Sequence, residues 1–83
     1  MKYQLTQHAR TVVAERNIRV EWMERALTRP TLTEPSATDP TLESRFVRIP
    51  EHGDRVLRVV VNKQTVPERV VSVYFDRTMK GKL

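Results

Sequence analysis

The sequence has 83 residues, no cysteine, and 15 Lys and Arg against 10 Asp and Glu, which gives a formal net charge of +5. A chain of this length has room for one small domain, residues 1–83, and without cysteines it can form neither disulfides nor thiolate metal sites. No run of apolar residues is long enough for a membrane span, whereas the basic balance favours an anionic partner such as RNA or an acidic protein. We therefore expect a cytoplasmic protein without a membrane anchor or a cofactor.

Two short amphipathic helices are predicted near the start of the chain. Thr6 can cap the first, over residues 7–16, because its hydroxyl can accept a hydrogen bond from a free amide of the first turn. Asn17 tolerates the left-handed conformation and is expected to end this helix. The second helix, over residues 20–28, is expected to stop before Pro30, which has no amide hydrogen and disfavours a helical conformation in the residue before it.

The remainder of the chain is predicted to form a loop followed by strands. Residues 30–41 are rich in proline, serine and threonine and predict an exposed loop, with at most a short edge strand at 31–34. The dense β-branched residues that follow predict strands over 42–49, 55–61 and 69–76. The basic tail after the last strand is expected to fray.

Alternation along these strands defines the two faces of the predicted sheet. The face expected under the helices is wholly apolar and comprises Leu57, Val59, Val61, Val71, Val73 and Phe75. The opposite face carries Val56, Arg58, Val60, Val70, Ser72 and Tyr74, and the first hairpin adds Phe46 and Arg48. A simple register places Arg58 opposite Ser72 and diagonal to Tyr74. The predicted fold is α+β, with two N-terminal helices packed on one face of a three- to four-stranded antiparallel sheet.

The open face of this sheet is a candidate binding surface. Arg45, Arg48, Arg58 and Tyr74 could contact RNA or a protein partner, because guanidinium groups suit phosphate oxygens and tyrosine can stack on a base. Two alternatives remain open. The face could be an ordinary half-exposed sheet surface, or it could be the interface of a homodimer.

The stretch YQLTQHARTVVAERNIRVEWMERALTRP resembles the opening of a family of small bacterial domains known as domain of unknown function 4258. The resemblance depends on the order and spacing of Tyr3, Thr6, His8, Ala9, Arg16, Ile18, Trp22 and Pro30. The later RVLRVVV and VVSVYFD stretches resemble the family's strand pair. The family is similar in layout to the RelE and BrnT toxins, small basic α+β proteins that cleave messenger RNA without a metal. The resemblance therefore implies a metal-independent endoribonuclease toxin, whose partner would be an acidic antitoxin.

Metal-free RNA cleavage needs a base, an acid and cations that stabilise the charged phosphorane. His8 could move a proton, because histidine changes its protonation state near neutral pH. Arg16 and Arg58 could hold the phosphate, and Tyr74 could stack on a base or donate a proton. His8 and Arg16 are eight residues apart, about 12 Å along a helix axis, so only a long side chain could bring both to one phosphate.

Other features of the sequence favour a role without catalysis. Val12 stands where the family commonly has an arginine one turn after the histidine, which favours a module that binds nucleic acid or protein and does not cleave. His8 could instead be structural, bonding locally or packing its ring on a strand. His52, in the turn PEHGD, is expected to be exposed and without a role. The histidines and acids show no metal-ligand spacing, and the two glycines form no phosphate-binding loop.

Overall fold

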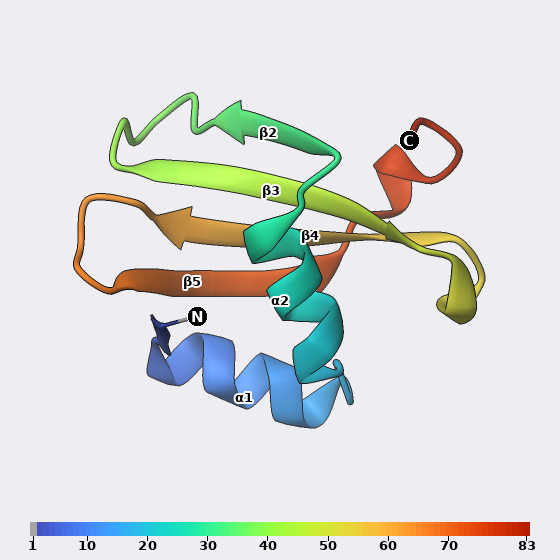
Figure 1. Cartoon of the computed structure of the whole chain (residues 1–83), viewed down its shortest axis with the longest axis horizontal. Helices are drawn as coiled ribbons and strands as arrows, with labels where there is room; N and C mark the ends of the chain where they lie inside the picture. Colours follow the sequence, from blue (N-terminus) through green and yellow to red (C-terminus); the bar gives the residue numbers. More distant parts are fainter. Residues whose placement is uncertain (1) are drawn as a thin grey trace.

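The computed structural model describes residues 2–83 and confirms the predicted α+β class, with two helices and a five-stranded sheet (Figure 1). The helices are α1 (Gln7–Glu15) and α2 (Val20–Thr28). The strands are β1 (Tyr3–Leu5), β2 (Leu32–Pro35), β3 (Leu42–Ile49), β4 (Arg55–Asn62) and β5 (Glu68–Phe75). Two short 3₁₀ helices, η1 (Pro50–His52) and η2 (Arg77–Met79), follow β3 and β5 and lie at the same end of the sheet (Figure 1).

The helices begin and end where their sequence signals predict, to within one residue. The hydroxyl of Thr6 accepts a hydrogen bond from the amide of Ala9 at 3.2 Å and caps α1. Asn17 adopts a left-handed conformation with φ of 52°, and Ile18 turns into the core. Helix α2 covers the predicted residues 20–28, and the chain leaves it just before Pro30. It buries one apolar stripe against β3 and β4, formed by Trp22, Met23, Ala26 and Leu27.

The sheet is larger than predicted and is mixed, not antiparallel. Its strand order is β1-β5-β4-β3-β2, and β1 pairs with β5 in parallel, with Tyr3 beside Glu68. The expectation of a three- to four-stranded antiparallel sheet is therefore wrong on strand number and direction. Strand β1 has only three residues, so it shows no alternation that the sequence could reveal, and its hydrogen-bond partners all come from β5. The backbone of Thr6 extends this pairing by donating to the carbonyl of Val70 at 3.0 Å.

The loop over residues 30–41 contains the short edge strand that was predicted within it. Strand β2 pairs antiparallel with β3, with Leu32 beside Phe46. It begins one residue later than the predicted 31–34 and ends at Pro35, which has no amide to donate to a further strand. Strand β3 matches the predicted residues 42–49.

A β-bulge changes the register that the sequence suggests for β4 and β5. Arg58 lies directly opposite Tyr74, and Val60, not Arg58, lies opposite Ser72. The register shifts between Val60 and Val61, so that Val61 pairs with Val70. The predictions that Arg58 faces Ser72 and that Val70 belongs to the open face are therefore wrong, because Val70 is buried in the helix-covered core. A bulge inserts one unpaired residue, and every side chain beyond it changes face relative to a simple ladder.

The main core lies between the helices and one face of the sheet. Its buried members are Ala9, Ile18, Trp22, Met23, Ala26, Leu27, Val47, Ile49, Leu57, Val59, Val61, Val70 and Val73. The opposite sheet face, which neither helix covers, also has buried side chains, namely Ser44, Phe46 and Val56. We call this second surface the open face.

Candidate functional site

Four side chains form one cross-strand row on the open face. The pairing of β2, β3, β4 and β5 places Leu32, Phe46, Arg58 and Tyr74 side by side. Phe46 is only 1% exposed, whereas Tyr74 at the end of the row is 38% exposed. Arg58 lies between them, with its guanidinium carbon 5.1 Å from the centre of the Phe46 ring and 5.7 Å from that of Tyr74. The row thus holds a cation between two aromatic rings, one buried and one open to solvent.

Hydrogen bonds fix the orientation of Arg58. Its Nε donates to the hydroxyl of Ser44 at 3.0 Å, and its Nη1 donates to the Asp76 carboxylate at 3.2 Å. Both partners have little exposure, which keeps the guanidinium plane in one position. A planar cation beside an accessible tyrosine can stack with, and hydrogen-bond to, an added planar or anionic group.

Asp76 connects the open face to the C-terminal segment. Its amide donates to the carbonyl of Val56 at 2.8 Å, and its carboxylate accepts from both the amide and the hydroxyl of Thr78. The bonds from Thr78, reinforced by that from Arg58, hold the pKa of Asp76 below its usual range. These bonds order η2, so the expectation that the whole basic tail frays is wrong for residues 77–79.

A cavity of about 280 Å³ opens beside η2, where β4 begins and β5 ends. Its lining combines three cations and one carboxylate with an aromatic and an aliphatic side chain: Arg55, Val56, Phe75, Asp76, Arg77 and Lys80. Arg55, Arg77 and Lys80 are not among the site residues predicted from the sequence. The signal that could have found them is the Asp-Arg-Thr triplet at 76–78, because aspartate two residues before threonine favours a local turn that orders the chain.

The four residues predicted to catalyse RNA cleavage do not converge. His8 and Arg16 lie exposed on α1 and at its C-terminal end, in the helix layer on one side of the sheet. Arg58 and Tyr74 lie on the open face, on the other side. Arg48 is exposed and occupies the open face next to Val56, where its ion pair with Asp54 is long at 3.8 Å. Of the predicted residues, the structure brings together Arg48, Arg58 and Tyr74.

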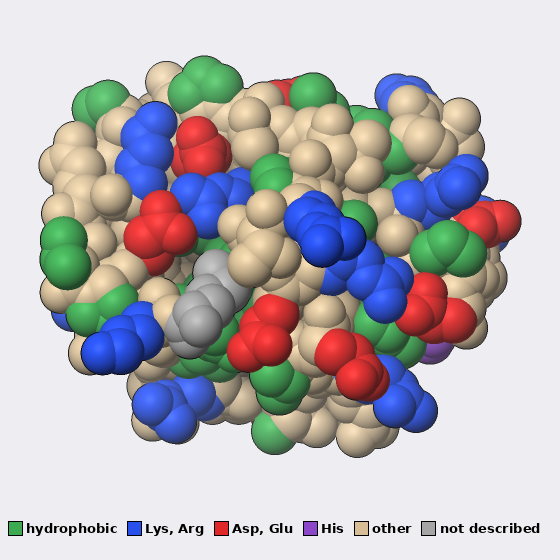
Figure 2. Space-filling model, viewed as in Figure 1, with side chains coloured by type: hydrophobic (Ala, Val, Ile, Leu, Met, Phe, Trp, Pro, Cys, Tyr) green, Lys and Arg blue, Asp and Glu red, His purple; other side chains and the backbone are tan. Residues whose placement is uncertain are grey.

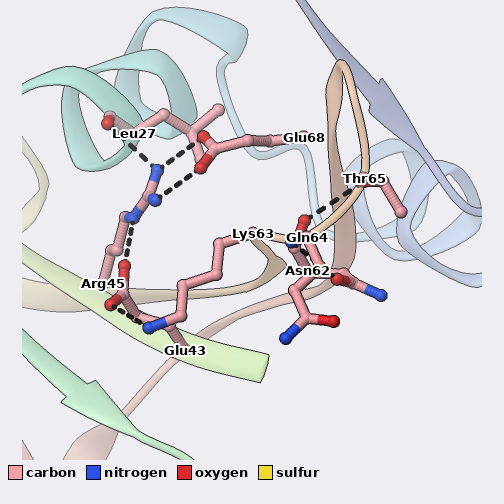
Figure 3. Close-up of polar contacts among 8 residues, drawn as sticks. All are labelled: Leu27, Glu43, Arg45, Asn62, Lys63, Gln64, Thr65 and Glu68. Atoms are coloured by element: carbon pink, nitrogen blue, oxygen red, sulfur yellow. Dashed lines mark hydrogen bonds and ion pairs between the residues drawn. The ribbon is translucent and has the colours of Figure 1, made fainter. Parts of the chain in front are cut away.

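Arg45, also predicted to contact a partner, lies on the helix-covered side within an ion network (Figure 3). Its guanidinium donates two hydrogen bonds to Glu68, at 2.9 and 2.8 Å, and one to Glu43 at 2.8 Å. It also donates to the carbonyl of Leu27 at the end of α2, and its side chain is only 11% exposed. The bonds from Arg45 lower the pKa of Glu68, while Glu68 and Glu43 raise that of Arg45. Arg45 thus ties β3 to β5 and to α2.

His52 is not the exposed turn residue that the sequence suggested. Its half-buried ring lies 5.0 Å from the ring of Trp22 and 5.0 Å from that of Phe75. The neighbouring Glu51 accepts two hydrogen bonds from Arg25, which lower its pKa to about 2. The sequence could not show this, because Trp22 and Phe75 are distant in the chain and meet His52 only in the folded protein.

Some basic side chains are paired with acidic ones, whereas the cations beside η2 are not, in the part of the chain that the structure describes. The face on which α2 lies carries neighbouring basic and acidic side chains (Figure 2), among them the pairs Arg19–Glu21, Arg25–Glu51 and Arg45–Glu68. Within residues 2–83, Arg55, Arg77 and Lys80 form no ion pair with any acidic side chain. Over the same residues, no group of three or more histidine or acidic side chains could hold a metal ion. None of the described helices is long and apolar enough to cross a membrane.

The fold and the open face together define a small basic α+β domain, with two helices on one side of a mixed sheet and an arginine–tyrosine surface on the other. The model of the family "Domain of unknown function (DUF4258)" matches residues 5–75, most of the chain. This protein belongs to that family. Comparison with the curated proteins and with the solved structures gave no significant match. The similarity to RelE and BrnT toxins stays a prediction.

Proposed function

We propose that this domain binds single-stranded RNA on its open face and does not cleave it. The observation that carries the proposal is the position of Arg58, held between Phe46 and the accessible Tyr74 on the sheet face without helices. Proteins bind single strands by stacking bases on aromatic and guanidinium planes while cations follow the backbone. Tyr74 offers the stacking surface, and Arg48 and Arg58 lie beside it on the same face.

The electrostatics of the surface support the same ligand. The chain carries a formal net charge of +5, which favours an anionic ligand. The unpaired cations Arg55, Arg77 and Lys80 gather where β4 begins and β5 ends, beside Asp76, whose carboxylate accepts a hydrogen bond from Arg58. An anionic strand that stacks on Tyr74 would therefore find further cations along its path.

Binding is favoured over cleavage because the side chains proposed for catalysis are divided by the sheet. A proton-transfer group must come within hydrogen-bonding reach of the reacting atoms, directly or through one water. His8, on the helix side, cannot share a phosphate with Arg58 across a sheet whose interior is filled by side chains. The endoribonuclease toxin implied by the family resemblance remains the competing hypothesis, and the experiment below distinguishes the two.

The test is fluorescence anisotropy with a short labelled uridine oligonucleotide and the full chain. Tyr74→Ala should weaken binding about 5- to 150-fold, because losing one base-stacking ring costs about 1–3 kcal/mol. Arg10→Gln is the matched control, since Arg10 is an exposed cation on α1 and its loss should change affinity little. Equal affinity in wild type and Tyr74→Ala would overturn the proposal.

Two further measurements separate the alternatives. RNA recovered after incubation should be intact, whereas cleavage that disappears in His8→Ala would support the toxin hypothesis and refute binding without cleavage. Light scattering coupled to size-exclusion chromatography gives the oligomeric state. A homodimer that Tyr74→Ala dissociates, or an acidic protein that competes with RNA for the wild type only, would identify the open face as a protein interface instead.

A further inference from the structure

We infer that the cavity beside η2 binds one phosphorylated nucleotide, either free in solution or as part of an RNA strand. This inference extends the proposed function, and only its RNA-strand form rests on that function. The cavity, of about 280 Å³, lies near the lower end of the roughly 300–1,000 Å³ typical of small-ligand sites. A single nucleotide suits that volume, whereas a base pair does not.

The cations in the lining are free to bind an anion. Arg55, Arg77 and Lys80 contribute three positive charges and, within residues 2–83, pair with no acidic side chain. Three such groups clustered around one small cavity repel each other, and a bound phosphate would relieve that repulsion. Their donors can also supply several charge-assisted hydrogen bonds to phosphate oxygens.

The one carboxylate in the lining does not cancel this charge. Asp76 accepts hydrogen bonds from the amide and hydroxyl of Thr78 and from Arg58, so its oxygens are already engaged. Its role is to order η2, which carries Arg77 and leads into Lys80. The local net charge of the lining, three cations and one anion, stays positive.

The apolar part of the lining suits a base. Phe75 and Val56 form this part, and Phe75 is half-buried. The ring of Phe75 is supported from within the fold by His52 at 5.0 Å and by Trp22 at 6.1 Å. A supported ring beside three cations is the combination that recognises a nucleotide, with the base against the ring and the phosphate at the cations.

The test is an NMR titration of the full-length protein with adenosine 5′-monophosphate, adenosine and inorganic phosphate. Adenosine monophosphate should bind most tightly and should shift the resonances of Phe75 and residues 77–80. Arg77→Gln and Lys80→Gln should each weaken it about tenfold, since each removes a charge-assisted contact. Lys82→Gln is the matched control, because Lys82 is a cation of the same tail that does not line the cavity.

The outcomes separate this inference from the proposed function. Tyr74→Ala should leave adenosine monophosphate binding unchanged while it weakens RNA binding. Adenosine monophosphate that binds no better than adenosine, or that is insensitive to both Arg77→Gln and Lys80→Gln, overturns the nucleotide site even if RNA still binds at Tyr74. If adenosine monophosphate binds as expected, its ability to displace the uridine oligonucleotide would show that the cavity binds a nucleotide of an RNA strand. Independent binding of the two ligands would show that the cavity binds a free nucleotide.

Discussion

Arg58 and Tyr74 are direct cross-strand partners in β4 and β5, and the guanidinium of Arg58 lies over the Tyr74 ring at 5.7 Å. The same guanidinium covers Phe46, bonds to Ser44 and pairs with Asp76, so one side chain organises the whole open face. Arg58 is therefore both a candidate RNA contact and a residue that stabilises the fold.

Arg58→Lys should lower the free energy of unfolding by about 1–2 kcal/mol although it keeps the charge. A lysine ammonium is not planar and cannot cover Phe46 while bonding to both Ser44 and Asp76. Urea denaturation should show a lower midpoint with an unchanged slope. Arg69→Lys is the control, because Arg69 is exposed in β5 and forms no ion pair within residues 2–83. An equal effect of both substitutions would contradict this account of Arg58.

RNA affinity should fall with salt, and Arg77→Gln should make that dependence shallower. Each phosphate that a cation neutralises on a single strand contributes about −0.7 to the slope of log affinity against log salt. Removing Arg77 should therefore reduce the slope by about that amount if the strand enters the cavity. Anisotropy titrations over a range of salt concentrations give the slope. An unchanged slope would place Arg77 outside the path of the strand.

Arg45→Met should destabilise the protein by about 3 kcal/mol, near the lower end of the range for breaking a buried ion pair because Glu68 is partly exposed. The substitution leaves Glu43 and Glu68 without their common cation inside the fold. Adding Glu68→Leu to Arg45→Met should restore part of the loss, since two apolar side chains need no partner. Thermal or urea unfolding of the two variants measures both effects. Little or no loss in Arg45→Met would show that the network is not a significant source of stability.

Acid should destabilise the protein through Glu51. Its hydrogen bonds from Arg25 lower its pKa in the folded state to about 2, below the ordinary value of 4.5. The stabilisation is therefore complete above about pH 4.5 and is lost as the pH falls toward 2. Between pH 4.5 and pH 2, the free energy of unfolding should fall less steeply with decreasing pH for Glu51→Gln than for wild type. A matching pH dependence in the two proteins would show that this pair contributes nothing to acid sensitivity.

High pH should destabilise the protein through the ionisation of Tyr3. Its hydroxyl donates to Glu24 at 2.8 Å, and partial burial together with this carboxylate raises its pKa to about 12 from 10.0. Because the folded value is the higher one, the stabilisation is complete below about pH 10 and is lost as the pH rises toward 12. Tyr3→Phe should cost about 1 kcal/mol at neutral pH and should remove this alkaline loss. Absorbance titration of Tyr3 in a Tyr74→Phe background measures the ionisation directly; a midpoint near 10 would contradict the prediction.

Local signals were enough to predict both helices and three strands. Thr6, Asn17 and Pro30 act on their own turn of chain, so the ends of α1 and α2 follow from near neighbours. Strands β3, β4 and β5 contain enough β-branched residues for prediction to within one residue at each end. Strand β1 could not be found in this way, because three residues give no pattern and only β5 makes them a strand.

The candidate site was predicted less well, because tertiary structure determines it. Arg45 and Arg48 differ by three residues in one strand, so they lie on opposite faces, one in an ion network and one exposed. The register of β4 and β5, which includes a bulge near Val61, places Tyr74 and not Ser72 opposite Arg58. The predicted sheet already separates His8, on a helix, from Arg58, on the open face, and the structure has the same arrangement.

The parallel pairing of β1 with β5 has a consequence for synthesis on the ribosome. Tyr3 cannot pair with its partner strand until Glu68 and the residues after it have left the exit tunnel, so β1 waits for β5. Helix α1 packs on β5 and must wait as well. The hairpin of β3 and β4, which needs only its own turn, can form before β5 has left the tunnel. A stop codon before β5 would therefore release a chain with neither its parallel edge nor a docked first helix.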